Sequence, residues 1–272
     1  MKLIDFDARF AEYLTDWVRE NEKKFKTPED MEDAMPEVYV QFLEKPADWL
    51  EGATPGAYFD SVSDAAKLCG LLCDYAKAEI PVPDPLLSRL EELAEEEALL
   101  QLVLDTDAPC EARMHGIALL RQMESTAPMT DYLRWQVTRC EEDDLLDNAL
   151  ESLRDMGEAV HKPAKIAFSA ADASGKEALL DVLCDFPADD DVFAFTLHCF
   201  QTQKARRGLF AGYLAKLDDD RALEPLLDVA EQGDVDYVDF IEIRSAIERL
   251  GSEAPIRDFT NDPTYAAVQR LQ

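Results

Sequence analysis

Apolar side chains recur every three to four positions along much of this chain, which is the spacing of one face of an α-helix. Residues 5–25 show the pattern first, with apolar positions from Phe6 to Val18. Thr27 followed by Pro28 predicts the next helix start, because a threonine hydroxyl caps free N–H groups and proline is favoured in the first turn. The chain therefore begins with predicted helices.

Two further helices follow in the pattern. One comes after Pro36, and a strongly apolar one extends from a capping Ser63 to Ala78. Between them, the Pro- and Gly-rich segment 46–56 predicts a loop, because both residue types interrupt helices. A second Pro-rich segment, 80–85, ends this helical region.

Beyond these segments the chain repeats itself. Five predicted helices end in an apolar residue, two spacers and a second apolar residue: Leu120/Met123, Leu153/Met156, Leu183/Phe186, Leu214/Leu217 and Ile247/Leu250. The first members are 33, 30, 31 and 33 residues apart. A period of this length is typical of helical solenoids. One helix pair cannot bury both of its apolar faces, so neighbouring pairs must cover each other.

We therefore predict an all-α fold in two parts. Residues 1–80 form an N-terminal helical region that caps the stack, and residues 84–272 form an array of helix pairs, or both parts form one continuous domain. The first helices of the predicted pairs lie near 128–140, 162–171, 190–200 and 221–231.

One stretch resembles a known family. Asp219-Asp220-Arg221-Ala222 opens one helix, and the segment 243–251 has an arginine followed by small and apolar residues before Leu-Gly. Residues 219–251 thereby resemble the short bacterial HEAT repeat of the armadillo-type α-solenoids. Residues 84–218 keep the period but not the Asp-x-Arg-Ala start.

The resemblance implies a right-handed α-α superhelix of about five helix pairs, whose second helices line a concave surface. Those helices lie near 109–124, 143–157, 175–186, 204–217 and 237–250. Such arrays serve many unrelated roles, so the resemblance predicts fold more directly than function.

The charge of the chain narrows the choice of partners. There are 58 acidic and 27 basic residues, which gives a net charge of −31 at pH 7. This field repels phosphate backbones and anionic membrane surfaces, and it attracts basic proteins. No apolar run has the length of a signal peptide or a membrane-spanning helix. We expect a cytoplasmic protein that binds neither nucleic acid nor membrane.

No motif predicts catalysis, a cofactor or a metal site. Cys69 and Cys73 stand four residues apart and could supply two metal ligands, but their helix is apolar, which favours core packing. His198 and Cys199 are adjacent and diverge by about 100° on a helix, so they do not form a nucleophile–base pair. The six scattered cysteines suit reduced, buried thiols. We expect a protein that is not an enzyme.

Acidic runs precede three of the predicted helices: Glu141–Asp144, Asp189–Asp191 and Asp218–Asp220. None has the alternating acids, central glycine and distal glutamate of a calcium loop. Carboxylates at these places cap free N–H groups and oppose the helix dipole.

Two features are candidates for partner binding. Lys204, Arg206 and Arg207 open a helix that also carries Tyr213, and this cluster could bind an acidic peptide or a phosphate. The alternative is neutralisation by neighbouring carboxylates. Trp49 belongs to a residue type that is enriched in binding hot spots, although it could instead fix its loop to the helical body.

The sequence leaves three functions open. The first is a non-enzymatic protein-interaction scaffold, suggested by the repeats and the missing catalytic set. The second is an acidic mimic that occupies a basic, nucleic-acid-binding protein, suggested by the charge of −31. The third is an enzyme on a HEAT scaffold that acts on nucleic acid, which the charge opposes.

Overall fold

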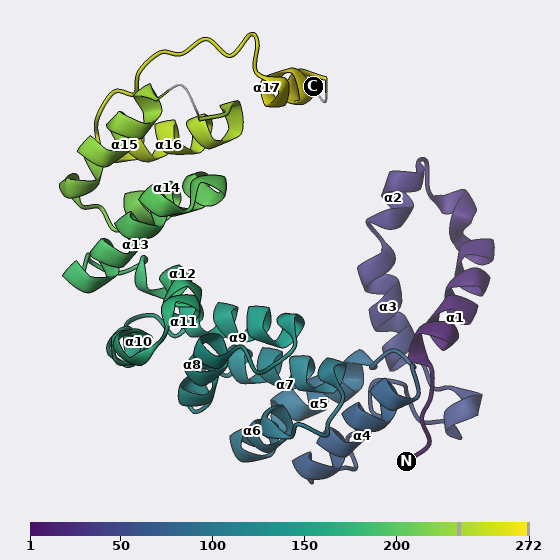
Figure 1. The fold of residues 1–272 in the computed structure, drawn as a ribbon. Helices are drawn as coiled ribbons and strands as arrows, with labels where there is room; N and C mark the ends of the chain where they lie inside the picture. Colours follow the sequence, from purple (N-terminus) through teal and green to yellow (C-terminus); the bar gives the residue numbers. More distant parts are fainter. Residues whose placement is uncertain (233–234, 271–272) are drawn as a thin grey trace. The chain divides into compact units, whose positions relative to one another are not determined.

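The protein is described by a computed structural model, which covers residues 1–232 and 235–270 (Figure 1). Within these residues the regular structure consists of α-helices and short 3-10 helices, without a β-strand. The predicted all-α class is confirmed. No helix in this part of the chain combines the length and the apolar character needed to cross a membrane.

The chain divides into two compact units, and the sequence passes from one to the other more than once. Unit 1 comprises Met1–Pro128 and Glu142–Asp155, and unit 2 comprises Met129–Glu141 and Met156–Gln272. The helices of unit 1 are α1 (Phe6–Asn21), α2 (Pro28–Glu32), α3 (Met35–Glu44), α4 (Ala65–Lys77), α5 (Asp84–Leu93), α6 (Glu96–Leu104), α7 (Cys110–Gln122) and α9 (Asp143–Asp155). The helices of unit 2 are α8 (Met129–Thr138), α10 (Glu158–Ala170), α11 (Ala173–Ala178), α12 (Leu180–Leu183), α13 (Asp190–Thr202), α14 (Arg207–Lys216), α15 (Leu223–Glu231), α16 (Tyr237–Arg249) and α17 (Pro263–Gln269).

Helix starts in unit 1 follow local capping chemistry. Thr27 caps α2 through a reciprocal box: its hydroxyl accepts a hydrogen bond from the Asp30 N–H, and the Asp30 carboxylate accepts one from the Thr27 N–H, both at 3.1 Å. Helix α4 is capped by Asp64, whose carboxylate accepts from the Lys67 N–H at 3.3 Å. The predicted cap, Ser63, lies one residue earlier.

Packing in unit 1 joins helices on both sides of the Pro-rich segment 80–85. Helix α4 packs against α5, α6 and α7, and α7 packs against α6 and α9. This segment therefore lies inside a compact unit and does not separate two of them. A short 3-10 helix, η2 (Asp48–Leu50), interrupts the predicted loop 46–56.

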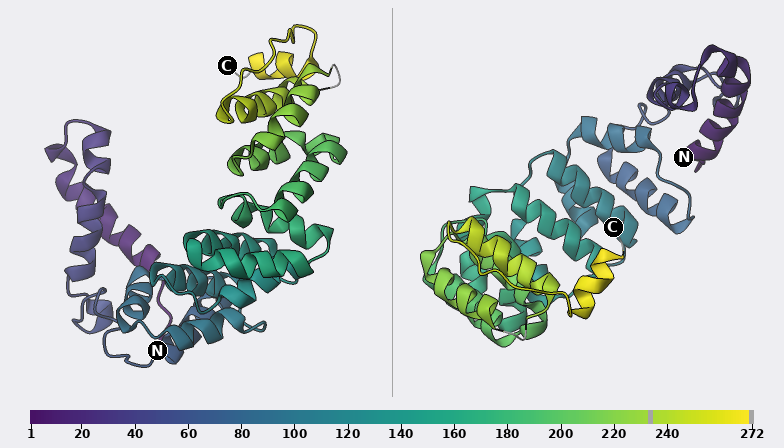
Figure 2. Two further views of the ribbon diagram at one scale, coloured as in Figure 1. Left: turned by 90° about the vertical axis from the view of Figure 1, so that its left-hand side faces the viewer. Right: turned by 90° about the horizontal axis from the view of Figure 1, so that it is seen from above.

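In unit 2, most contacts join helices that are next to each other along the chain or separated by one helix. Helix α8 packs on α10 and α11, α13 on α14, and α16 on both α14 and α15. The α14–α16 pair can be followed in the views of Figure 2, where the two helices lie side by side. Their close approach depends on Gly208, where an added Cβ would come within 3.1 Å of Asp239 and Glu242.

The core contains the first member of each predicted anchor pair, whereas of the second members only Leu217 is buried. The first members of the five repeated pairs are all buried: Leu120, Leu153, Leu183, Leu214 and Ile247. The largest fully buried side chains include Trp135, Tyr132, Tyr75 and Phe168. Apolar spacing along the chain therefore identified which side of each helix is buried.

Candidate functional site

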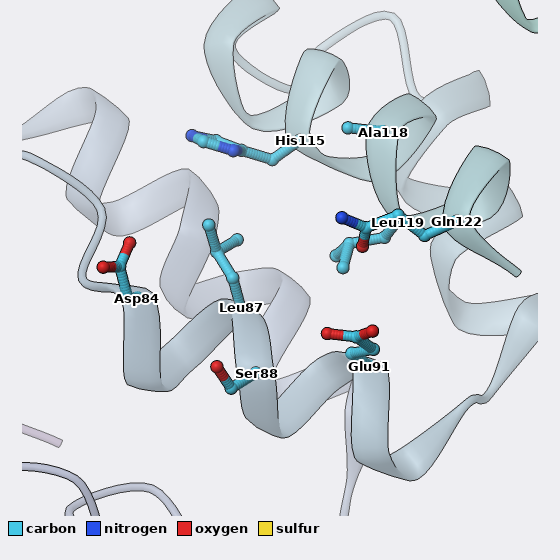
Figure 3. A pocket seen from close by; sticks show the side chains of 8 residues that line it. All are labelled: Asp84, Leu87, Ser88, Glu91, His115, Ala118, Leu119 and Gln122. Atoms are coloured by element: carbon cyan, nitrogen blue, oxygen red, sulfur yellow. The ribbon is translucent and has the colours of Figure 1, made fainter. Parts of the chain in front are cut away.

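A surface pocket of about 340 Å³ lies between α5 and α7 in unit 1 (Figure 3). Four residues from each helix line it: Asp84, Leu87, Ser88 and Glu91 from α5, and His115, Ala118, Leu119 and Gln122 from α7. Figure 3 shows the two sets facing each other across the pocket. Its volume is at the lower end of the roughly 300–1,000 Å³ that is usual for ligand sites.

The local sequence explains why these side chains share a face. In each helix the four residues stand at positions i, i+3, i+4 and i+7, which lie on one side of an α-helix. The opposite side of α5 carries the buried Leu86 and Leu90, and that of α7 carries the buried Ile117 and Leu120. Each lining residue of α7 follows its α5 counterpart by 31 positions, which is one repeat period. The two sets of lining residues are thus related by a constant shift of 31 positions.

Acidic side chains stand at both ends of the α5 side. Asp84 and Glu91 are exposed and are separated by two helical turns, about 10 Å along the axis. Neither carboxylate forms an ion pair with any residue that the structure describes. Near Asp84 lies the Tyr39 hydroxyl, whose pKa is raised first by burial and then by a hydrogen bond to that carboxylate.

On the α7 side, His115 is half-buried. Burial lowers the pKa of this imidazole, and the neighbouring Glu111 opposes the shift only in part. A histidine with a pKa below the usual 6.5 is neutral at pH 7. The pocket therefore has two negative groups and no positive one at neutral pH.

These charged and polar groups suit the binding of a ligand. Across the described residues, no hydrogen bond joins the Ser88 hydroxyl to His115, so a serine–histidine nucleophile pair is not assembled. Among residues 1–232 and 235–270, no three His, Cys, Asp or Glu side chains gather closely enough to hold a metal ion. The polar groups could instead accept hydrogen bonds from a cationic ligand.

Sequence reasoning did not find this pocket, although its signal is in the sequence. The i, i+3, i+4, i+7 sets that carry Asp84 and His115 are displaced by one repeat period. Two partly polar helix faces that are related by a shift of 31 positions are the pattern that would have located it.

The predicted basic cluster is divided by the fold. Lys204 and Arg206 are exposed, whereas Arg207 and Tyr213 are only 5% and 7% exposed. The two buried side chains are therefore not available to a partner, because helix packing points them inward. Arg206 forms an ion pair with Glu177, as the neutralisation alternative expects. Burial, followed by the charge of a neighbouring aspartate, raises the pKa of Tyr213.

Trp49 is half-buried in an aromatic cluster of unit 1. Its ring packs edge-on against Phe6 at 5.8 Å between centroids, and the Arg9 guanidinium lies 5.5 Å from the Trp49 ring. These contacts hold the loop 46–56 to α1. The indole therefore has a structural role in fixing its loop.

The cysteines are all free thiols. Cys69, Cys184 and Cys199 are buried as expected, and burial raises the pKa of Cys69 to about 11 and that of Cys184 to about 12. Cys73 and Cys110 are half-buried and Cys140 is exposed, contrary to the expectation that all six thiols are buried. Cys140 comes directly after Arg139, which has a positive φ and lies beyond the end of α8.

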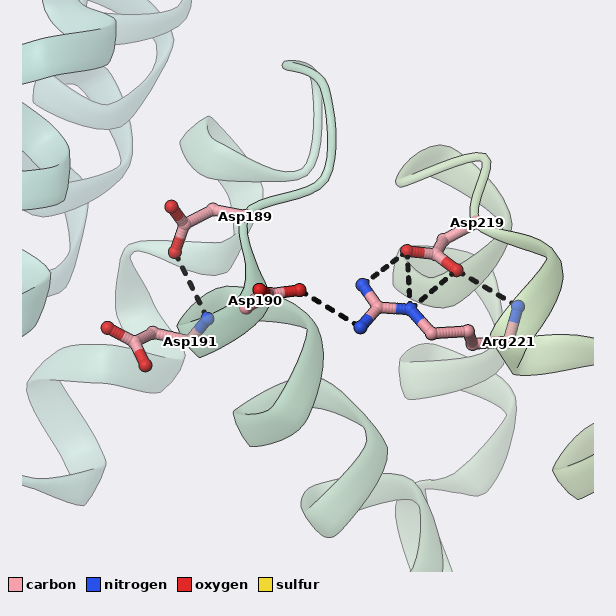
Figure 4. A network of polar contacts seen from close by, with 5 residues as sticks. All are labelled: Asp189, Asp190, Asp191, Asp219 and Arg221. Carbon is pink, nitrogen blue, oxygen red and sulfur yellow. Dashed lines mark hydrogen bonds and ion pairs between the residues drawn. The ribbon is translucent and has the colours of Figure 1, made fainter.

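A charged network connects two helix starts in unit 2 (Figure 4). The Arg221 guanidinium donates to Asp219 at 2.6–3.0 Å and to Asp190 at 2.9 Å. It also lies 4.3 Å from the centroid of the Phe193 ring. Asp219 caps the 3-10 helix η4 (Asp220–Ala222) ahead of α15, while Asp190 opens α13, so one arginine connects two neighbouring pairs. Two of the predicted acidic runs, Asp189–Asp191 and Asp218–Asp220, therefore supply a helix cap, as predicted: Asp189 in the first and Asp219 in the second.

Comparison with protein-family models, with curated proteins and with solved structures gives no match. The resemblance of 219–251 to a HEAT repeat therefore rests on its sequence pattern. The functional proposal therefore depends on the geometry of this chain alone.

Other basic side chains also form ion pairs with acidic side chains from neighbouring helices or the loops next to them. Ion pairs of this kind join Arg121 to Glu151, Lys165 to Asp189, Arg206 to Glu177 and Lys216 to Asp185. Acids without a basic counterpart are left over, because acidic residues exceed basic ones by 31. The excess negative charge faces solvent.

Proposed function

We propose that this chain is a non-enzymatic protein-binding module, built as a HEAT-like α-solenoid, whose partner presents a basic surface. The packing order supports the solenoid. In unit 1, α5 packs on α7 and α7 on α9, and in unit 2, α14 packs on α16. Helices about one repeat period apart thus touch directly, as stacked units do. In this reading the N-terminal helices α1–α3 cap the array.

One observation carries the choice of partner: the fold buries arginines and exposes acids. Arg113 and Arg207 are each 5% exposed, and the Arg113 Nε donates to the Val103 carbonyl at 2.8 Å. In contrast, not one Asp or Glu among the described residues is buried. The negative charge is therefore available at the surface, while part of the positive charge is not.

Exposed carboxylates act on binding mainly through rate and specificity. A field of one sign steers an oppositely charged partner and accelerates association, and like-charged partners are rejected. Each exposed pair contributes little by itself. The module is expected to discriminate by the total charge and by local pockets.

The test is capture followed by a salt titration. The immobilised chain is incubated with lysate of its source cells, bound proteins are identified by mass spectrometry, and each is purified for calorimetry. We expect a basic partner whose affinity falls as NaCl rises from about 0.01 M to about 1 M, because the Debye length shortens from roughly 30 Å to roughly 3 Å. The absence of any reproducible partner, or affinities unaffected by salt, would contradict the proposal.

The same surface supports a second candidate, an acidic mimic that occupies a nucleic-acid-binding protein. The observation that favours it is the excess of 31 acidic residues, none of which is buried among the residues that the structure describes. Duplex DNA would then compete with the chain for the captured partner. A partner that binds DNA and this chain at the same time would exclude mimicry and leave the interaction module in place.

A further inference from the structure

We propose that the α5–α7 pocket receives a lysine or arginine side chain of the basic partner, with the cationic group at the end formed by Glu91 and Gln122. This inference rests on the proposed function and specifies where the contact is made. It concerns unit 1 alone.

Charge complementarity is the first argument. The lining contains Asp84 and Glu91 but no lysine or arginine. In the part of the chain that the structure describes, neither carboxylate has a cationic partner within ion-pair distance. Some acids between helices are matched by cations, as Asp189 is by Lys165 at 2.6 Å. Asp84 and Glu91 are not matched in this way, so both carboxylates are available to a cation from outside the chain.

Helix ends add a second argument for the position of the charge. Glu91 lies in the last turn of α5, and Gln122 is the last residue of α7. In Figure 3 the two helices run in the same direction along the pocket, so both C-terminal ends lie on the Glu91 side. Carbonyl groups of a last helical turn lack intrahelical partners, and the dipole makes that end negative. A cation is consequently favoured there over the Asp84 end, where α5 begins.

The apolar part of the lining suits the stem of a long basic side chain. Leu87, Ala118 and Leu119 lie between the two polar ends. Lysine and arginine bury their methylene groups along apolar surface while the charged group stays near water and its counter-charge. The volume of about 340 Å³ leaves room for such a side chain and part of its neighbour.

His115 contributes to the selectivity of the pocket for a cationic side chain. Because burial keeps this imidazole neutral at pH 7, it does not repel a cation. The Gln122 amide oxygen can accept a hydrogen bond from an ammonium or guanidinium group. An acidic side chain would meet only carboxylates and neutral groups, so the pocket disfavours it.

The test uses the full chain and a defined probe, the fluorescein-labelled peptide (Arg-Ser-Gly)₃ with blocked ends. Fluorescence anisotropy gives its affinity for the wild type and three variants. Glu91→Gln removes the negative charge at the end where the cationic group is proposed to bind, and Ala118→Phe fills the pocket without changing the net charge. Glu96→Gln is the matched control, since Glu96 is exposed at the start of α6 and does not line the pocket. Circular dichroism checks that each variant is folded.

We expect Glu91→Gln and Ala118→Phe to weaken binding by about five- to tenfold, and Glu96→Gln by less than about twofold. Proton NMR provides an independent readout, because the chain has only three histidines. Saturation with the peptide should shift the His115 ring resonance, assigned through a His115→Asn variant, and leave those of His161 and His198 in place.

The outcomes separate this inference from the proposed function. Salt-sensitive binding that is equal in all four proteins, with no selective His115 shift, would overturn the pocket assignment and leave a diffuse acidic surface as the binding element. If the peptide does not bind the wild type at low salt, the pocket assignment fails, and the capture experiment decides the function separately.

Discussion

Arg221 shows how much one side chain can connect in this protein. Its guanidinium binds the cap of its own helix, Asp219, and the first residue of α13, Asp190, while its plane lies over Phe193. Arginine suits this role because its planar, five-donor group can bind two carboxylates and stack on a ring at once. A lysine at this position could make only some of these contacts.

We predict that Arg221→Ala lowers the melting temperature more than Arg244→Ala does. Arg244 is equally exposed, and its one ion-pair partner among the described residues is Glu248, four residues along the same helix, at 2.7 Å. Pairs of that type contribute about 0.3–0.5 kcal/mol. Thermal unfolding followed by circular dichroism compares the variants. Equal losses would mean that the link between α13 and α15 adds nothing to stability.

Acid provides a second test of the same contact. The hydrogen bonds from Arg221 hold the pKa of Asp219 below its usual 3.8. A lowered folded-state pKa stabilises the protein above pH 3.8, and this contribution is lost as the pH falls through the folded-state value. The difference in melting temperature between wild type and Arg221→Ala should therefore shrink below pH 3.8. A difference that is independent of pH would contradict this linkage.

Thiol exposure gives another residue-scale prediction. Cys140 should react rapidly with a disulfide reagent in the native protein, because it is exposed, whereas Cys69 and Cys184 should wait for unfolding, because burial suppresses their thiolates. The measurement is the absorbance of released thionitrobenzoate. Cys140→Ser should remove the fastest phase. If that phase persists in the variant, another thiol is accessible.

At the scale of elements, two glycines test how closely the helices approach. An added Cβ at Gly116 in α7 would lie 2.8 Å from Val103 Cγ2 in α6, whereas one at Gly70 in α4 meets no atom within 4 Å. Both substitutions gain similar helix propensity, but only the first overpacks an interface. We expect Gly116→Ala to be less stable than Gly70→Ala by about 1–3 kcal/mol, measured by urea unfolding. Similar values would show that α6 and α7 can move apart at little cost.

The same scale shows what the sequence could predict. Helical spacing located most helices beyond residue 109, although α5 and α6 were not predicted one by one. It also located buried positions, since residues such as Leu153 and Ile247 must meet a neighbour wherever that neighbour lies. Local chemistry also located the Thr27 cap. The inward direction of Arg207 and Tyr213 was not predictable, because it depends on the angle at which α14 meets other helices.

The pocket was predictable only in part. Each of its faces is readable from the spacing around Asp84 and His115. Their meeting across α5 and α7 depends on tertiary packing, which no single helix encodes. The two faces are 31 positions apart, but this relation identifies a pocket only once α5 and α7 are known to pack together.

For the whole molecule, the net charge of −31 sets the response to salt. Self-repulsion among exposed acids destabilises a compact chain, and added salt screens it. We predict that raising NaCl from about 0.01 M to about 0.15 M increases the melting temperature by a few degrees, because the screened repulsion outweighs the weakened surface ion pairs. Calorimetry at fixed pH measures this, with sucrose as an uncharged control. A fall in melting temperature would mean that the ion pairs dominate.

The exposure of the acidic side chains also has a consequence for the small ions in solution, since no Asp or Glu in the described part of the chain is buried. Electroneutrality at pH 7 requires the solution around each molecule to hold an excess of 31 monovalent cations. A basic partner that docks on this surface displaces some of those ions into bulk solution, as charged ligands do when they neutralise a polyanion. Association would then be driven in part by the mixing entropy of small ions, and the number released could be counted from the dependence of affinity on salt activity.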